Sequence, residues 1–176
     1  MTQKFIGMFK SSSLFLSNTI EVKPMKSNGK NNIAVVIRKM TIEDYDSLIA
    51  LWKKGNISYR PQGRDSKKNI RWQLQQPNSF YFVAEHDGKI VGAILGTHDG
   101  RKGWINRLIV TLTYHRKGIA KRLIEEIEHH LTAVGIDIVA CLIEDWNVTS
   151  MQVFERLGYT KNTDILYFSK RKNMKI

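Results

Sequence analysis

The segment Tyr114-His115-Arg116-Lys117-Gly118-Ile119-Ala120 joins an apolar run to an amphipathic one, and the fold can be predicted outward from it. This is the pattern of a basic loop that enters the N-terminus of a helix. The first N–H groups of a helix have no partner within it, and the helix dipole adds positive charge, so such a loop can bind phosphate. Gly118 lets a pyrophosphate approach the backbone, because it has no Cβ. The same pattern also occurs as a solvated helix cap, so the loop alone does not decide the function.

The residues after the loop predict a helix over 118–134, with apolar side chains on one face and charged side chains on the other. The apolar face comprises Ile119, Ala120, Leu123, Ile124, Ile127, Leu131 and Val134. Gly135 ends this helix. The nearly all-apolar run 136–143 then predicts a strand that is buried on both faces beside a parallel neighbour.

The residues before the loop predict an antiparallel meander, with a hairpin turn at Asp87-Gly88. Its three strands are expected over 79–85, 89–96 and 104–111. Other elements follow from β-branched runs and from helical periodicity. They are a strand at 34–38, helices at 41–52, around 67–75 and at 148–157, and strand material within 159–169.

The order of these elements predicts an α/β (α+β) fold with a mixed, mostly antiparallel central sheet and flanking helices. A helical crossover between the third meander strand and the strand at 136–143 can make these two strands parallel. The length of 176 residues allows one domain with residues to spare. We expect that domain over 33–176, and we interpret residues 1–32 as a flexible basic N-terminal tail.

A second motif follows the crossover: Asn147-x-x-Ser150-x-x-x-Phe154-x-x-x-Gly158-Tyr159. Together with the apolar strand at 108–110 and the loop at 114–120, its order and spacing resemble the Gcn5-related N-acetyltransferase (GNAT) superfamily. The resemblance covers roughly residues 35–169. It implies an acetyl-CoA-dependent N-acetyltransferase with no metal, whose two parallel strands splay apart at the cofactor site.

The resemblance also implies which residues hold acetyl-CoA. The backbone amides of 116–121 would hold its pyrophosphate, and the strand edge at 108–110 would pair with its pantetheine arm. Asn147 would reach the pantetheine, and Phe154 would lie along the thioester. The expected cofactor-binding residues are Leu108, Ile109, Val110, His115, Arg116, Lys117, Gly118, Ile119, Ala120, Lys121, Asn147 and Phe154.

The sequence departs from the family pattern at three places. His115 replaces the usual Gln or Arg that opens the loop. Phe154 stands where many relatives have a tyrosine that protonates the leaving thiolate, and phenylalanine has no proton to donate. The segment 102–107 offers no acid, whereas relatives often place a glutamate there. We therefore take Glu144, at the end of the strand that flanks the splayed site, as the candidate catalytic base. The alternative is that Glu144 pairs with Arg107 as a structural ion pair.

The net charge of +12 does not by itself predict nucleic-acid binding. Residues 1–32 contribute +4 and residues 161–176 another +4, so only +4 lies in between. The charged ends lack the interleaved aromatic residues of a stacking platform. No apolar run is long enough for a membrane span. The single cysteine, Cys141, fits a cytoplasmic location and a buried position better than a nucleophile.

The sequence thus predicts direct attack of a primary amine on the thioester. Its acceptor is a small molecule or a protein amine, and the sequence does not choose between them. A non-catalytic acyl-CoA-binding or interaction module of the same fold is the alternative, and a nucleic-acid-associated protein is a third. A homodimer is left open.

Overall fold

A five-stranded sheet forms the centre of the protein in a computed structural model that describes residues 34–172. The strands follow the order β1-β2-β3-β4-β5 across the sheet. They are β1 (Val36–Lys39), β2 (Ser79–His86), β3 (Lys89–His98), β4 (Gly103–Val110) and β5 (Val139–Cys141). The first four are antiparallel and β5 is parallel to β4. The predicted mixed, mostly antiparallel sheet is confirmed.

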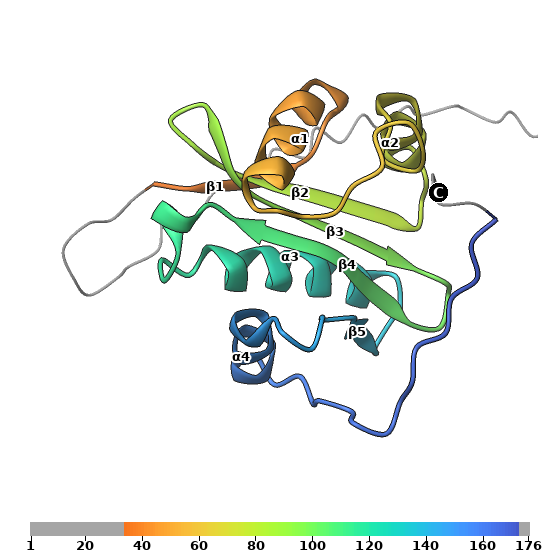
Figure 1. Ribbon diagram of the computed structural model, residues 1–176. Coiled ribbons are helices and arrows are strands. Elements are labelled where there is room, and N and C mark those ends of the chain that lie inside the picture. The colour runs from red at the N-terminus through yellow and green to blue at the C-terminus, as the bar shows by residue number, and fades with distance from the viewer. Residues whose placement is uncertain (1–33, 173–176) are drawn as a thin grey trace, which may run out of the picture.

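Helices cover both faces of this sheet (Figure 1). On one face, the 3-10 turn η1 (Ile42–Asp44) leads into α1 (Tyr45–Lys54), and α2 (Lys67–Leu74) follows. On the other face lie α3 (Ile119–Ala133) and α4 (Val148–Arg156). The 3-10 turn η2 (Leu112–Tyr114) connects β4 to the loop before α3. These bounds agree with the predicted helices to within a few residues.

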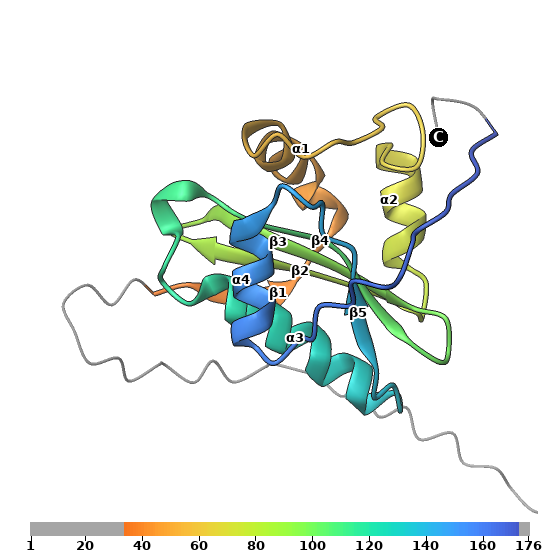
Figure 2. The ribbon, with the colours of Figure 1, turned by 60° about the horizontal axis from the view of Figure 1, so that its bottom comes forward.

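The two faces of the sheet carry two separate cores, because successive side chains of a strand point to opposite faces. In β2, Tyr81 and Val83 join the cluster around Trp52 under α1 and α2. Phe82 and Ala84 join the cluster under α3, which also includes Phe154 of α4. The α4 helix lies beside α3 on that face (Figure 2).

Glycines in the sheet let α3 pack closely against it. A Cβ added at Gly96 would lie 2.7 Å from Ile127 Cδ1, and one at Gly103 would lie 2.4 Å from Leu131 Cδ1. Both distances are shorter than van der Waals contact. The side chains of α3 therefore occupy the space that larger residues at these two positions would need.

A β-bulge in β4 separates the paired part of this strand from its open part. Leu95 of β3 faces Arg107 and Gly96 faces Ile105, so Asn106 has no partner on β3. On the other side, β4 pairs with β5 only from Gly103 to Ile105. A bulge bends a strand and increases its twist. The bend at Asn106 thus coincides with the point where β4 and β5 separate.

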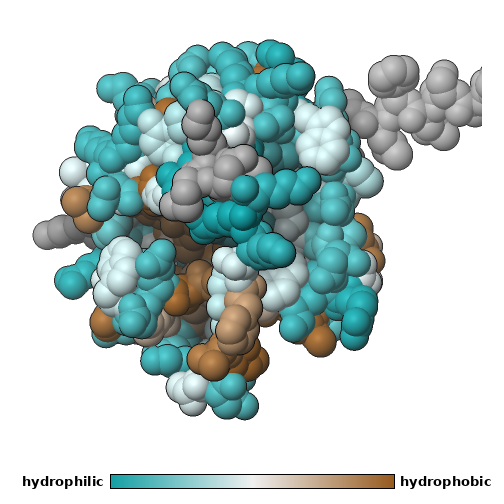
Figure 3. All heavy atoms as spheres, turned by 45° about the vertical axis from the view of Figure 1, so that its right-hand side comes forward, coloured by the Kyte–Doolittle hydropathy of each residue, from teal (hydrophilic) through white to brown (hydrophobic). Residues whose placement is uncertain are grey.

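Two predictions about strands were wrong. The strand expected over 136–143 extends only over β5, and it is half-buried rather than buried on both faces. No strand forms within the predicted segment 159–169, and residues 160–172 are all exposed. A strand needs a ladder partner, and the three residues of β5 offer a short edge. Ile165, Leu166, Tyr167 and Phe168 are consequently 69–86% exposed. Figure 3 shows a face of the protein on which hydrophobic residues lie among hydrophilic ones.

Among residues 34–172, no helix combines the length and the hydrophobicity that crossing a bilayer requires.

Candidate active site

The loop between β4 and α3 contains two residues with a left-handed backbone. Arg116 and Gly118 both adopt positive φ, of 59° and 75°. Gly118 is the N-cap of α3 and offers no side chain to cap the helix. A Cβ at Gly118 would meet no atom within 4 Å, so open space lies in front of this backbone. Glycine is required here by the backbone conformation rather than by packing.

The backbone N–H groups of residues 116–121 form a row of free donors. Within the described part of the chain, none of them donates a hydrogen bond, and the first such bond of α3 runs from Arg122 N to Gly118 O. The side chains of Arg116, Lys117 and Lys121 add positive charge, and all three are exposed. Donors and charge at a helix N-terminus together favour an anion. The residues predicted to hold the pyrophosphate are thus brought together with the chemistry that a phosphate needs.

Two contacts brace this loop against the sheet, and a third lies within the loop. The Tyr114 hydroxyl and His86 Nδ1 lie 3.0 Å apart, which connects the loop to the end of β2. His115 Nε2 lies 2.8 Å from the carbonyl oxygen of Val110 at the end of β4. The ammonium of Lys117 lies 5.2 Å from the centre of the Tyr114 ring. The His115 side chain therefore positions the loop. That the backbone of His115 contacts acetyl-CoA stays a prediction.

The open part of β4 leads directly to this loop. Leu108, Ile109 and Val110 pair with β3 on one side, but their other edge has no β5 partner. An unpaired strand edge presents N–H and C=O groups that an extended amide-containing ligand can bond. The pantetheine arm of acetyl-CoA has two amides, so the residues present fit the expected group.

Asn147 is the N-cap of α4, and Phe154 lies within this helix. The Asn147 side chain caps α4, because its Oδ1 accepts a hydrogen bond of 3.1 Å from Ser150 N. Among the residues that the structure describes, its Nδ2 group donates no hydrogen bond, so it can bind a ligand. Phe154 is buried, with its ring edge-to-face against Tyr159 at 4.9 Å. Phe154 can thus offer an apolar wall and no proton.

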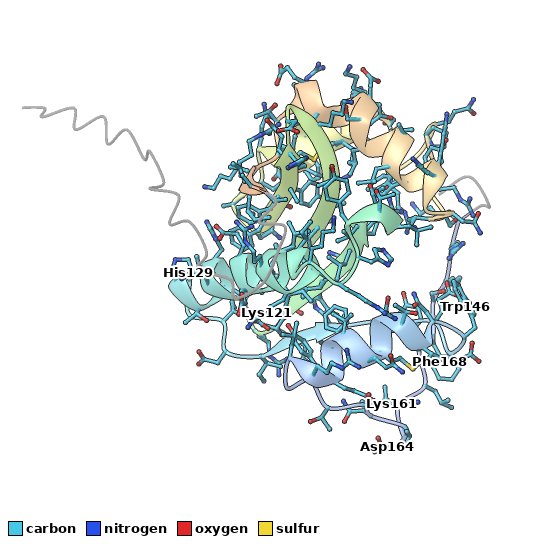
Figure 4. The ribbon with its side chains drawn as sticks, turned by 90° about the vertical axis from the view of Figure 1, so that its left-hand side faces the viewer. Lys121, His129, Trp146, Lys161, Asp164 and Phe168 are labelled. Carbon is cyan, nitrogen blue, oxygen red and sulfur yellow. The ribbon has the colours of Figure 1, made fainter. Side chains whose placement is uncertain are left out.

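Glu144 lies on the exposed connection between β5 and α4. Its Oε2 accepts a hydrogen bond of 2.9 Å from the indole Nε1 of Trp146. Trp146 lies just before α4 and is exposed, at the edge of the molecule in Figure 4. An exposed carboxylate at this place can accept a proton from an amine and can attract a cation.

Arg107 is held by a residue that sequence reasoning missed, and the predicted alternative pairing with Glu144 is wrong. Arg107 Nη1 and Nη2 donate to Asp65 Oδ1 and Oδ2 at 3.0 and 3.1 Å. Asp65 is buried on the connection between α1 and α2. The segment 55–78 contains five basic residues and one acid, Asp65. This isolated acid is the one feature of the sequence that could have pointed to its role.

The remaining candidate groups are consistent with structural roles. Burial raises the pKa of the Cys141 thiol to about 11, so it is not an activated nucleophile at neutral pH. Burial also raises the pKa of Tyr159, whose hydroxyl donates to Glu128 Oε1 at 2.7 Å. Across residues 34–172, no cluster of three or more His, Cys, Asp or Glu side chains could hold a metal ion.

Comparisons with known proteins agree with this geometry. Residues 45–159 match the model of the acetyltransferase (GNAT) family. Aminoglycoside N-acetyltransferase AAC(6')-Iy, solved with a bisubstrate analogue of CoA and acetylneamine, is similar in structure. It has a TM-score of 0.67 at 20% identity, over 78% of this chain and 99% of that one.

Two other solved structures are similar as well. An aminoglycoside acetyltransferase from an uncultured soil metagenomic sample, solved with trehalose, has a TM-score of 0.66 at 21% identity. The match covers 79% of this chain and 97% of that one. The PaiA N-acetyltransferase from Thermoplasma acidophilum, solved with coenzyme A, has a TM-score of 0.62 at 20% identity. That match covers 71% of this chain and 89% of the other. At these identities the likeness establishes the fold.

Proposed function

Because the chain belongs to the acetyltransferase (GNAT) family and uses acetyl-CoA as its co-substrate, we propose that it transfers the acetyl group to a primary amine of a small molecule by direct attack. The observation that carries this proposal is the row of free N–H groups at 116–121 beside the open edge of β4. The row supplies a phosphate site, and the edge supplies a place for an extended arm. The opening between β4 and β5 then receives the thioester.

The acceptor is proposed to be cationic before it reacts. Glu144 and Asp145 lie exposed on the connection between β5 and α4, where they attract a positively charged amine. One aminoglycoside acetyltransferase of the same fold was solved with sisomicin, and another with a bisubstrate analogue of CoA and acetylneamine. A small molecule that carries several amines fits both observations.

The proposed reaction needs no covalent enzyme intermediate. The amine nitrogen attacks the thioester carbonyl carbon, the new C–N bond forms and the C–S bond breaks. The proton released by the amine goes to Glu144 or to water, and the CoA thiolate takes a proton from solvent. Backbone N–H groups on the open edge of β4 can polarise the carbonyl oxygen as negative charge develops on it. Most of the rate enhancement then comes from proximity and orientation.

A panel of amines tests the proposal. The full-length protein is incubated with acetyl-CoA and with sisomicin, spermidine or a lysine-containing peptide with a free N-terminus. Thiol release measures the rate, and mass spectrometry identifies an acetylated product. We expect turnover with at least one of the two small-molecule polyamines.

Two results would contradict the proposal. Acetylation of the peptide alone would reverse the choice of a small-molecule acceptor. Tight binding of acetyl-CoA without transfer to any amine, even at pH 9, would instead favour the non-catalytic module.

A further inference from the structure

Arg107 stands at the first residue after the bulge in β4, where this strand has already left β5. Its side chain is 12% exposed and that of its partner Asp65 is 6% exposed. The two groups form two parallel hydrogen bonds, a geometry that fixes the guanidinium in its plane. Each charge therefore depends on the other, since a buried charge without its partner is costly.

The same two residues hold the connection between α1 and α2 together. Asp65 Oδ2 accepts from Arg60 N at 2.7 Å, and the Asp65 carbonyl accepts from the Tyr45 hydroxyl at 2.9 Å. Arg107 Nη2 also donates to Ser58 O at 3.1 Å. Asp65 thus folds the segment 57–66 onto itself, and Arg107 fixes that segment to β4.

A third contact fixes the guanidinium from another direction. Its central carbon lies 4.2 Å from the centre of the Trp52 ring, on α1. Trp52 is fully buried, so its ring is held in place by the core around it. A lysine ammonium could not make the fork to Asp65, the bond to Ser58 O and the stacking at once.

We propose that Asp65 and Arg107 are a positioning pair, which holds the segment 57–66 as the acceptor-side wall of the opening beside β4. The inference rests on the proposed function, because it assigns the acceptor to this side of the opening and acetyl-CoA to the side of α3. Neither residue reacts. Their effect is to fix where the amine stands relative to the thioester, since Arg107 directly precedes the strand edge at 108–110.

Two measurements on the full-length protein test the pair, with Arg107→Lys as the first variant. We expect hydrogen exchange of peptides from 57–66 to accelerate by about tenfold or more. We expect the KM for the panel amine with the highest rate to rise by between about 10- and 100-fold, with kcat less affected. The Kd for acetyl-CoA, from calorimetry, should stay within about twofold of its original value, because the α3 loop is unchanged.

A double variant guards against loss of folding. Asp65→Leu/Arg107→Met replaces the ion pair by apolar groups and leaves no buried charge alone. It should retain the melting temperature of the protein more closely than Arg107→Lys, yet still show fast exchange in 57–66 and a raised acceptor KM.

The matched control is the pair of Arg38 and Asp44, which is also bidentate, at 2.7 and 2.8 Å. It joins β1 to η1, and β1 is three strands away from β4. Arg38→Lys should lower stability without changing the acceptor KM. Unchanged exchange in 57–66 or an unchanged acceptor KM in folded variants would overturn the inference. So would a Kd for acetyl-CoA that rises in step with that KM. If no panel amine is acetylated, the proposed function fails on its own, and the exchange result alone decides whether the pair holds the segment.

Discussion

Among single residues, Gly118 combines an unusual backbone conformation with open space. Its φ of +75° lies in the left-handed region, and an added Cβ would meet no atom within 4 Å. Other residues adopt this conformation only at a cost. The space in front of it is where the pyrophosphate is proposed to lie. A negative charge introduced at Gly118 would therefore repel the ligand directly.

We expect Gly118→Asp to abolish measurable binding of acetyl-CoA, since it adds both bulk and negative charge beside the phosphate. Calorimetric titration of the folded variant measures this. Gly100→Asp is the matched control, because Gly100 has a φ of +87° and equally open surroundings but lies in the turn between β3 and β4. Equal affinities of the two variants would contradict the proposed phosphate site.

Glu144 is tested by the pH dependence of its variant. An amine of pKa near 10 is only about one part in a thousand neutral at pH 7, so a proton acceptor helps most there. We expect Glu144→Gln to lower the transfer rate at pH 7 by about 100-fold or more, and much less at pH 9. Asp145→Asn should have little effect at either pH. A loss for Glu144→Gln that does not depend on pH would remove Glu144 from proton transfer.

A site residue can be predicted from the sequence when its role depends on its neighbours in the chain, and not when it depends on a residue far away in the chain. Gly118 could be predicted, because a glycine before an amphipathic helix is a local turn signal. Asp65 could not, because its partner Arg107 lies 42 residues away and no periodicity joins the two. The pairing of Arg107 with Glu144 was wrong for the same reason. The sequence predicts both residues near the opening, but it does not show which acid contacts Arg107.

At the scale of elements, regular patterns predicted regular structure. The helices and the meander were predicted correctly because their apolar periodicity indicates which face is buried. The length of β5 and the state of 159–169 were not, because a strand also needs a partner edge, which periodicity does not record. The bulge at Asn106 is a third example, since it depends on the register between β3 and β4.

The junction between β1 and η1 predicts a loss of stability in acid. The hydrogen bond from Arg38 holds the pKa of Asp44 below its usual value of 3.8. A carboxyl whose pKa is lower in the folded state stabilises that state above the unfolded pKa, and this contribution is lost as pH falls through the folded one. The free energy of unfolding should therefore fall below about pH 4.

Asp44→Asn measures this contribution. We expect it to lower the free energy of unfolding at pH 7 by about 1–2 kcal/mol, allowing for the partly exposed Arg38. At pH 3 the difference should be smaller. Urea midpoints at the two pH values give the result. Asp46→Asn is the control, because the exposed pair of Asp46 with Lys67 should contribute little at pH 7. An equal loss for Asp44→Asn at both pH values would contradict the assignment.

For the whole molecule, the uneven distribution of charge leads to a separate prediction. Since +8 of the net +12 lies in residues 1–32 and 161–176, weak binding to polyanions should depend on the ends of the chain. We expect removal of residues 1–32 to reduce binding to a labelled oligonucleotide, while acetyl-CoA affinity and transfer persist. Fluorescence anisotropy and thiol release measure the two properties. Loss of transfer in a folded truncated protein would place residues 1–32 within the functional unit.

The bulge in β4 should make the protein respond differently to a substitution and to a deletion at the same position. Asn106 is exposed, and its side chain bonds only the hydroxyl of Thr97 among the described residues, so almost any residue could stand there. Its presence matters more than its identity, because the extra residue bends β4 away from β5. We expect a substitution at 106 to be tolerated, whereas loss of that one codon would realign the strands and close the opening. The separation of β4 from β5 therefore depends on the number of residues in β4 rather than on which residue stands at position 106.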